Sequence, residues 1–221
     1  MTDTGQDVVL LAGATGLIGR EILRLLLADA GIAQVHTLGR KPPPLQHAKL
    51  QHHASDLRQI PPLPPLQRVY IALGTTIKVA GSQEAFRAVD HDAVLAVARA
   101  ARAAGATRLG LVTAMGADPQ SRIFYNRVKG EVEQAVAQLG FETLVIARPS
   151  MLVGDRSAVH QPERRGELIA AAISKALRPL IPANYRAIHV RDVAQALVAT
   201  VARGAAGRQL LLSGQMQARQ A

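Results

Sequence analysis

The sequence predicts an α/β protein with a Rossmann-type, doubly wound parallel sheet and a small irregular cap near the C-terminus. Three observations predict this fold. Short apolar runs alternate with segments whose apolar residues recur at helical spacing. A glycine-rich turn, "GATGLIG", directly follows the first apolar run. No internal repeat or interdomain linker interrupts the 221 residues, so one domain is expected over residues 1–221.

The first half of the chain supplies four predicted strands. Residues 7–13, "DVVLLAG", are an apolar run that ends in glycine, as expected for a buried parallel strand. A helix should follow over 17–30, with further strands over 34–40, around 49–57 and over 68–74. Proline-rich stretches flank the third strand, and we expect them to be surface loops.

The second half continues the alternation and then leaves it. Its predicted elements are, in order, a helix over 82–105, a strand over 107–114, a helix around 121–133, a strand over 141–149, a helix over 189–204 and a last strand over 208–214. Residues 150–187 depart from this rhythm and are expected to form the irregular cap on the ligand side. Strands that alternate with helices imply right-handed crossovers and therefore a parallel sheet.

Composition narrows the functional classes. The chain has no cysteine, which excludes disulfides, thiolate zinc sites and a cysteine nucleophile. The N-terminus is polar and no run is long enough for a membrane span, so we expect a cytoplasmic protein with no membrane partner. The net charge of +10 is spread along the chain and aromatic residues are only 3%, which argues against specific nucleic-acid binding. Charge-driven nucleic-acid binding is the weakest alternative.

The glycine-rich turn predicts a dinucleotide site. Gly13 permits a tight turn, Gly16 lets the backbone approach a pyrophosphate, and Gly19 lets the helix pack closely on the strand. The start of the following helix offers N–H groups and a positive dipole to phosphates. Thr15 should cap this helix or add a hydroxyl contact. The predicted contacts here are Gly13, Thr15, Gly16, Leu17, Ile18 and Gly19. A purely structural glycine turn is the alternative.

The end of the second predicted strand indicates which dinucleotide binds. NAD sites usually place Asp or Glu there to bind the adenosine ribose, but this chain has "LGRK". Arg40 offers a planar fork of donors to a 2′-phosphate, and Lys41 adds a second positive charge. The sequence therefore predicts NADP(H) as cofactor. Two solvated loop cations are the alternative.

Two later strand ends should line the same edge of the sheet. Asp56, followed by Leu57, is expected at the adenine, although an Asp that caps its own loop would look the same. The segment "ALGTT" is expected to run along the dinucleotide, and its predicted contacts are Ala72, Leu73, Gly74, Thr75 and Thr76. An ordinary exit from a strand is the alternative there.

The helix around 121–133 holds the predicted catalytic pair. Tyr125 and Lys129 are four residues apart and share one helix face. An ammonium beside a phenol favours phenolate, so Lys129 is expected to lower the pKa of Tyr125 from about 10. Such a phenol can protonate a carbonyl oxygen or accept the proton in reverse. Because the helix follows the fifth strand of a dinucleotide-binding sheet, it should border the nicotinamide.

These motifs resemble the atypical branch of the short-chain dehydrogenase/reductase superfamily. More narrowly, "ALGTTIKVAGSQEAFRAVDHDAV", "GADPQSRIFYNRVKGEVE" and "ARPSMLVGDR" resemble the Tat-interacting protein family of NADPH-binding oxidoreductase-like proteins. The resemblance implies that Tyr125 is the acid/base and that Lys129 holds the nicotinamide ribose. It implies Thr113 as the third catalytic residue, although Ala114 follows where relatives can have a second hydroxyl. It also implies a segment passing the nicotinamide, Pro149, Ser150 and Met151.

The predicted function is NADP(H)-dependent carbonyl reduction or alcohol oxidation by hydride transfer, with a small-molecule carbonyl or alcohol as substrate. The alternative is a non-catalytic, NADP(H)-sensing regulatory protein or scaffold that binds a protein partner. No metal is expected, because His52 and His53 are adjacent and would face opposite sides of a strand. Monomer and homodimer both remain open.

Overall fold

The protein is built around a seven-stranded sheet in which every neighbouring pair of strands is parallel. A computed structural model describes residues 6–153 and 182–217. The strands are β1 (Asp7–Ala12), β2 (Ile32–Gly39), β3 (Leu50–Ala54), β4 (Arg68–Ile71), β5 (Arg108–Val112), β6 (Thr143–Arg148) and β9 (Gly207–Leu212). Their order is β3-β2-β1-β4-β5-β6-β9. The predicted fold class is confirmed.

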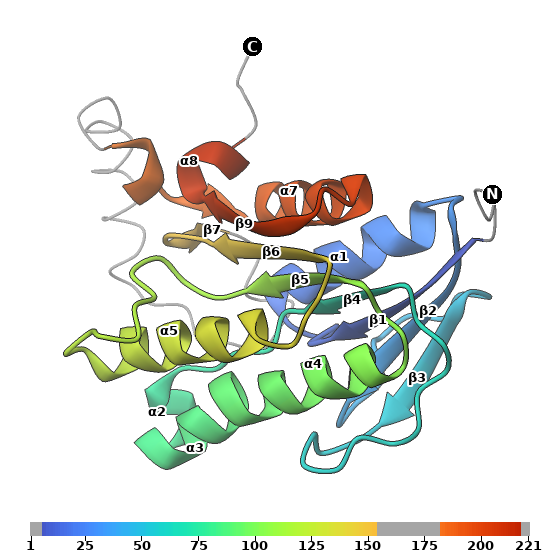
Figure 1. Cartoon of the computed structure of the whole chain (residues 1–221), viewed down its shortest axis with the longest axis horizontal. Coiled ribbons are helices and arrows are strands. Elements are labelled where there is room, and N and C mark those ends of the chain that lie inside the picture. The colour runs from blue at the N-terminus through green and yellow to red at the C-terminus, as the bar shows by residue number, and fades with distance from the viewer. Residues whose placement is uncertain (1–5, 154–181, 218–221) are drawn as a thin grey trace.

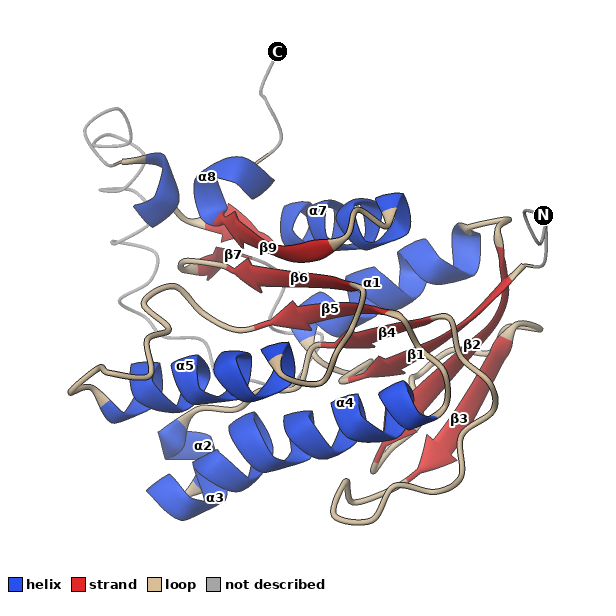
Figure 2. Ribbon diagram, viewed as in Figure 1, coloured by secondary structure: helices blue, strands red, loops and turns tan. Residues whose placement is uncertain are grey.

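Helices cover both faces of the sheet (Figures 1 and 2). One face packs against α1 (Leu17–Ala28) and α7 (Val190–Arg203), and the other against α4 (Val94–Ala103) and α5 (Phe124–Ala137). Burial on both faces explains why the central strands β1, β4, β5 and β6 are nearly continuous apolar runs rather than alternating ones.

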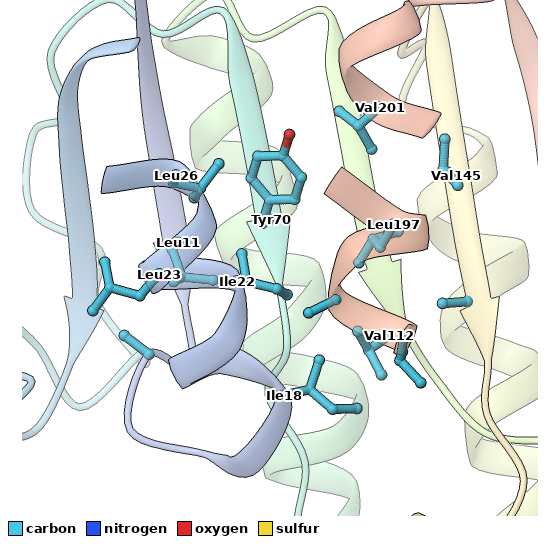
Figure 3. Packing of buried hydrophobic residues seen from close by; sticks show 14 of the residues in the cluster. Leu11, Ile18, Ile22, Leu23, Leu26, Tyr70, Val112, Val145, Leu197 and Val201 are labelled. Carbon is cyan, nitrogen blue, oxygen red and sulfur yellow. The ribbon is translucent and has the colours of Figure 1, made fainter. Parts of the chain in front are cut away.

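Side chains of successive strand residues enter the two layers in turn. On the α1/α7 side, Leu11 and Tyr70 from the strands meet Ile22 from α1 and Leu197 from α7 (Figure 3). On the α4/α5 side, strand residues such as Ile71 meet the apolar stripes of α4 and α5. Both layers are thus closed by helices with one apolar side, as the periodicity predicted.

The predicted helix over 82–105 is not continuous. It consists of α3 (Gln83–Arg87), a π-helical segment η1 (Ala88–Ala93) and α4. A short helix α2 (Ile77–Ala80), which the sequence analysis did not predict, precedes it. A π segment accommodates one extra residue in a turn and is frequent at functional sites.

The helix that holds Tyr125 and Lys129 begins later than its sequence suggests. α5 starts at Phe124, and the residue before it, Ile123, is the N-cap without a side-chain hydrogen bond. The Ser121 hydroxyl accepts from the Ile123 N–H at 3.2 Å, so it ends the preceding turn rather than capping the helix.

The predicted cap over 150–187 is described only at its ends. Residues 154–181 lie outside the described residues. β7 (Leu152–Val153) pairs in parallel with β8 (Ile188–His189), and a 3-10 turn η4 (Ala183–Tyr185) packs on α8 (Ser213–Met216). Within the described ranges, no helix combines the length and apolar character needed to cross a bilayer. A single domain over 1–221 stays a prediction.

Candidate active site

The site lies where the crossovers of the sheet change direction. β1 and β4 are neighbours in the centre, and the chain runs outward from β1 to β2 on one side and from β4 to β5 on the other. In open α/β sheets, ligands bind outside the carboxyl ends of the strands at such a point. The glycine-rich turn leaves β1 here, and Ala72 to Thr76 leave β4 beside it.

The backbone at this point is too close-packed for side chains. Gly13 has φ +91°, and a Cβ on it would lie 2.5 Å from the Ala72 carbonyl oxygen. A Cβ on Gly19 would lie 1.9 Å from the Gly13 carbonyl oxygen. Both contacts are with main-chain atoms that cannot rotate away. Glycine is therefore required at both positions, and the resulting bare-backbone cradle fits a pyrophosphate.

The N-terminus of α1 opens onto this cradle. Its N-cap is Gly16, and no side chain caps the helix. The first N–H groups of a helix, here on Leu17, Ile18 and Gly19, have no partner within the helix and attract anions. Thr15 is exposed and is not the cap, so that part of the prediction is wrong. Its carbonyl oxygen accepts from Arg20 Nε at 3.2 Å.

The predicted adenosine contacts lie one strand further out. Arg40 and Lys41 are exposed and directly follow β2. Asp56, after β3, is also exposed, and its Oδ1 accepts from the Arg58 N–H at 2.9 Å, which supports the loop-capping alternative. Leu57 has φ +68°, an uncommon conformation for a side chain of this size.

Two side chains hold the backbone of the β4 exit loop by hydrogen bonds. The Thr75 N–H donates to Asp90 Oδ2 at 2.9 Å. The Thr76 hydroxyl accepts from the Val79 N–H at 3.2 Å and caps α2. Gly74 is exposed between Leu73 and this anchored pair. The predicted dinucleotide contacts therefore begin from a backbone of fixed shape.

A third group, the Asp90 carboxylate, joins the predicted pair of Tyr125 and Lys129. Lys129 is 4% exposed, and its Nζ lies 2.7 Å from Oδ1 of Asp90, which is fully buried on η1. The Tyr125 ring packs against the ring of Phe86, with centroids 5.3 Å apart. The helix spacing, this aromatic contact and the ion pair together hold the phenol and the ammonium on the buried side of α5.

The pKa of Tyr125 moves opposite to the prediction. Burial raises the pKa of the phenol above 10.0, the Lys129 ammonium lowers it, and the Asp90 carboxylate raises it again. The net result is a raised pKa, because burial outweighs the ammonium and Asp90 offsets it. The pKa of Asp90 is also raised by burial, against the opposing effects of Lys129 and the Thr75 N–H.

Thr113 belongs to a second cluster. Its hydroxyl donates to Glu133 Oε1 at 2.6 Å. Glu133 is 1% exposed and also accepts from Arg148 Nε and Nη2 at 2.9 and 2.6 Å, and from Arg208 Nη2 at 3.2 Å. The hydrogen bonds of the Thr113 hydroxyl go to Glu133 and to the Ala147 carbonyl, and none among the described residues joins it to Tyr125. Its catalytic role stays a prediction.

The segment after β6 is fixed by the C-terminal part of the chain. The Ser150 N–H donates to Ser213 Oγ at 2.7 Å, and the Ser150 hydroxyl donates to the Arg186 carbonyl. The Pro149 carbonyl accepts from the Met115 N–H at 2.9 Å, and Met151 is 62% exposed. Met151 is thus the side chain of this segment that is open to a ligand.

Sequence reasoning missed Asp90 and Glu133. Both had a signal. Asp90 stands four residues after Phe86 and four before Val94, on the apolar side of its helix. Glu133 continues the spacing of Tyr125 and Lys129 by one more turn. In the two described ranges, no group of three or more His, Cys, Asp or Glu side chains is arranged to hold a metal ion.

Solved structures with this fold include proteins in complex with NAD. MoeE5 in complex with UDP-glucose and NAD has a TM-score of 0.70 at 19% identity, over 92% of this chain and 74% of that one. The Bordetella bronchiseptica enzyme WbmF in complex with NAD+ has a TM-score of 0.68 at 17% identity, over 96% and 75%. A short chain dehydrogenase family protein from Francisella tularensis has a TM-score of 0.66 at 12% identity, over 95% and 98%. At these identities the likeness shows the fold.

The fold, the glycine cradle and the Tyr–Lys helix define a Rossmann-type protein of the short-chain dehydrogenase/reductase superfamily, as predicted. A sequence model of the NAD dependent epimerase/dehydratase family matches residues 9–212, and the chain belongs to that family. The narrower resemblance to the Tat-interacting protein family stays a prediction.

Curated relatives are fungal proteins named after mitochondria. "Protein fmp52, mitochondrial" of Emericella nidulans is 37% identical over 179 residues, 76% of each chain. Its namesake in Aspergillus fumigatus is 38% identical over 177 residues, again 76% of each. These names contradict the prediction of a cytoplasmic protein. That prediction was based on the polar character of the first residues, which does not distinguish a cytoplasmic from a mitochondrial protein.

Proposed function

We propose that this protein is an NADP(H)-dependent oxidoreductase that reduces a small carbonyl compound or oxidises the corresponding alcohol. The observation that supports it most directly is the buried Lys129 ammonium on the helix of Tyr125, beside the exit loop of β4. Family membership supports a nicotinamide cofactor. The glycine cradle at Gly13 and Gly19, which a Cβ would fill, fits its pyrophosphate.

Residues of this chain would donate the proton, orient the ribose and hold the loop beside the cofactor. The bound cofactor supplies or accepts hydride at its nicotinamide ring. Tyr125, with its raised pKa, is a protonated phenol at neutral pH, so it donates its Oη proton to the carbonyl oxygen during reduction. Lys129 forms an ion pair with Asp90, at 2.7 Å from Nζ to Oδ1, and its ammonium has N–H groups that can orient the ribose. The anchored loop at Thr75 limits movement of the backbone along the cofactor.

Replacing the phenol tests the proposal. With NADPH and a panel of aldehydes and ketones, Tyr125→Phe should lower turnover by about 10²–10⁴-fold, because a positioned acid contributes that much. Cofactor fluorescence can be read directly since the chain has no Trp, and it should show unchanged NADPH affinity. Tyr185→Phe is the matched control, because Tyr185 is 64% exposed. Equal turnover in wild type and Tyr125→Phe would remove Tyr125 from the mechanism.

The preference for NADP(H) rests on Arg40 and Lys41, which are exposed just after β2 where no carboxylate stands. Arg40→Ala should weaken NADPH binding about tenfold, as expected for loss of a charged hydrogen bond, and leave NADH binding unchanged. Arg99→Ala, an exposed arginine on α4, is the control. NADH binding as tight as NADPH in the wild type would contradict the assignment.

One observation favours the alternative, an NADP(H)-sensing regulatory or scaffold protein that binds a protein partner. The hydroxyl of Thr113, expected to hold a substrate carbonyl, donates to Glu133. For a sensor, NADPH should bind with wild-type affinity in Tyr125→Phe while no carbonyl compound in the panel is turned over by either protein.

A further inference from the structure

The buried carboxylate of Asp90 connects three elements of the site. It lies on η1, its Oδ1 is 2.7 Å from Lys129 Nζ on α5, and its Oδ2 accepts from the Thr75 N–H in the exit loop of β4. A Cβ on Gly74 would lie 3.5 Å from this Oδ1 and 3.8 Å from Lys129 Nζ, so the loop backbone lies directly over the ion pair.

Its placement depends on the π-helical segment. Asp90 is 0% exposed although it is charged, and charged side chains are rarely buried without a partner. The extra residue of η1 lies at the point where α3 passes into α4, next to α5. Replacing a buried ion pair by apolar groups is often neutral for stability, so the presence of this pair is weak evidence for a purely stabilising role.

We propose that Asp90 is a positioning residue of the catalytic site, which holds the Lys129 ammonium and the β4 exit loop in place and offsets the positive charge beside the Tyr125 phenol. This inference rests on the proposed function for its consequence in catalysis. With Asp90 charged, the ammonium is fixed for ribose binding without drawing the phenol toward phenolate, and Tyr125 remains an acid.

Few charged groups face Tyr125, so a change in its pKa on substitution of Asp90 can be assigned to Asp90 itself. On η1, Asp90 faces the site, while His91 pairs with the 63%-exposed Asp92. On α5, Lys129 faces it, and Glu131 pairs with Arg87 of α3. The segment Leu73–Thr76 of the β4 exit loop contains no titratable side chain. Among the described residues, Lys129 and Asp90 are the charges that shift the phenol.

The test is a titration of the phenol by tyrosinate absorbance, without cofactor or substrate. Subtracting the Tyr125→Phe titration in each background isolates Tyr125 from Tyr70 and Tyr185. Asp90→Asn should shift the Tyr125 midpoint to lower pH, because it removes a charge that favours the neutral phenol. Asp92→Asn is the matched control and should leave the midpoint unchanged. Asp90→Glu, which keeps the charge, should stay closer to wild type than Asp90→Asn.

An unchanged or raised midpoint in Asp90→Asn would overturn the inference. If Asp90→Asn does not fold, Asp90→Ala is the second neutral variant, and unfolding of both would make Asp90 a folding residue and also overturn it. Under turnover, the alkaline limb of kcat should shift to lower pH in the same variants. The absorbance titration needs no activity, so a protein without turnover would defeat the proposed function and leave this inference intact.

Discussion

α5 contributes to two buried ion pairs, one turn apart, that differ in how completely their groups are bonded. Glu133 accepts four hydrogen bonds from Thr113, Arg148 and Arg208. Lys129 has three N–H groups, and Asp90 is its ion-pair partner among the described residues. Glu133 ties the helix to β6, to β9 and to Thr113, the residue directly after β5, whereas Lys129 lies below an exit loop whose Gly74 is exposed.

The difference separates a carboxylate with all its acceptor positions occupied from an ammonium that, under the proposed function, binds the cofactor ribose. A carboxylate whose lone pairs are all occupied has no acceptor position left for a ligand. Removing it leaves its buried donors unsatisfied and lowers the stability of the fold. The Lys129 ammonium lies beside Gly74 and has more N–H groups than its ion pair with Asp90 needs, so it can bind a ligand without breaking that pair. Both residues are almost fully buried, since Glu133 is 1% exposed and Lys129 is 4% exposed. Exposure alone therefore does not distinguish the two positions.

The largest effect on stability is expected at the saturated pair. Glu133→Ala should lower the free energy of unfolding by about 3–5 kcal/mol, because it leaves two arginines and a buried hydroxyl without their acceptor. Chemical denaturation measures it. Glu131→Ala is the matched control on the same helix, and its half-buried pair with Arg87 should be worth about 1 kcal/mol or less. Equal losses in the two variants would abolish the distinction.

Lys129→Met should cost less, about 3 kcal/mol near neutral pH, and the loss should depend on pH. Lys129 opposes the rise that burial imposes on the pKa of Asp90, so without it that pKa rises further above 3.8. A carboxyl with a raised folded-state pKa contributes stability that is present at acid pH and is lost as the pH rises through that pKa. Relative to wild type, the variant should therefore unfold more easily at about pH 8 than at about pH 5. A pH-independent loss would contradict the coupling.

The smallest loss of stability is expected on substitution of Thr113. The same variant tests whether Thr113 acts with Glu133 or with Tyr125 and Lys129. Thr113→Val should cost about 1.5 kcal/mol, the worth of a hydrogen bond to a charged group, and retain turnover. Thr113→Ser keeps the hydroxyl and should be milder. Loss of turnover in Thr113→Val at full stability would instead return Thr113 to the catalytic role that the sequence predicts.

Features determined by local backbone geometry could be predicted from the sequence. The glycines at 13 and 19 are dictated by contacts within a few residues and with the adjacent strand, and the strands appear as apolar runs because both faces of the sheet are covered. Helix spacing likewise placed Tyr125 and Lys129 on one face. The Gly19 contact and the helix spacing are local in the chain, whereas Gly13 is also required by Ala72, which the βαβ pattern itself brings next to it.

Electrostatic features could not be predicted, because they depend on residues far apart in the chain. The pKa of Tyr125 was expected to fall, since only Lys129 was considered. Burial and Asp90, 35 positions earlier, reverse the direction. Thr113 was assigned by position in the strand, and its partner Glu133 comes from the next helix. The helix expected around 121–133 begins only at Phe124, because Ser121 closes a turn through its N–H to the Asp118 carbonyl and its hydroxyl accepts from the Ile123 N–H.

The π-helical segment Ala88–Ala93 makes the site sensitive to chain length as well as to residue type. A π-helical turn holds about one residue more than an α-helical turn, so losing one residue there would let regular α-helical winding return while α3 and α4 on either side keep their orientation. The change of direction would fall on the residues within the segment, Asp90 among them. Asp90 would then point elsewhere with its chemistry unaltered. A single-codon deletion in this stretch would act on the ammonium of Lys129 much as a substitution does, and homologous chains that differ by one residue here should differ in how that ammonium is held.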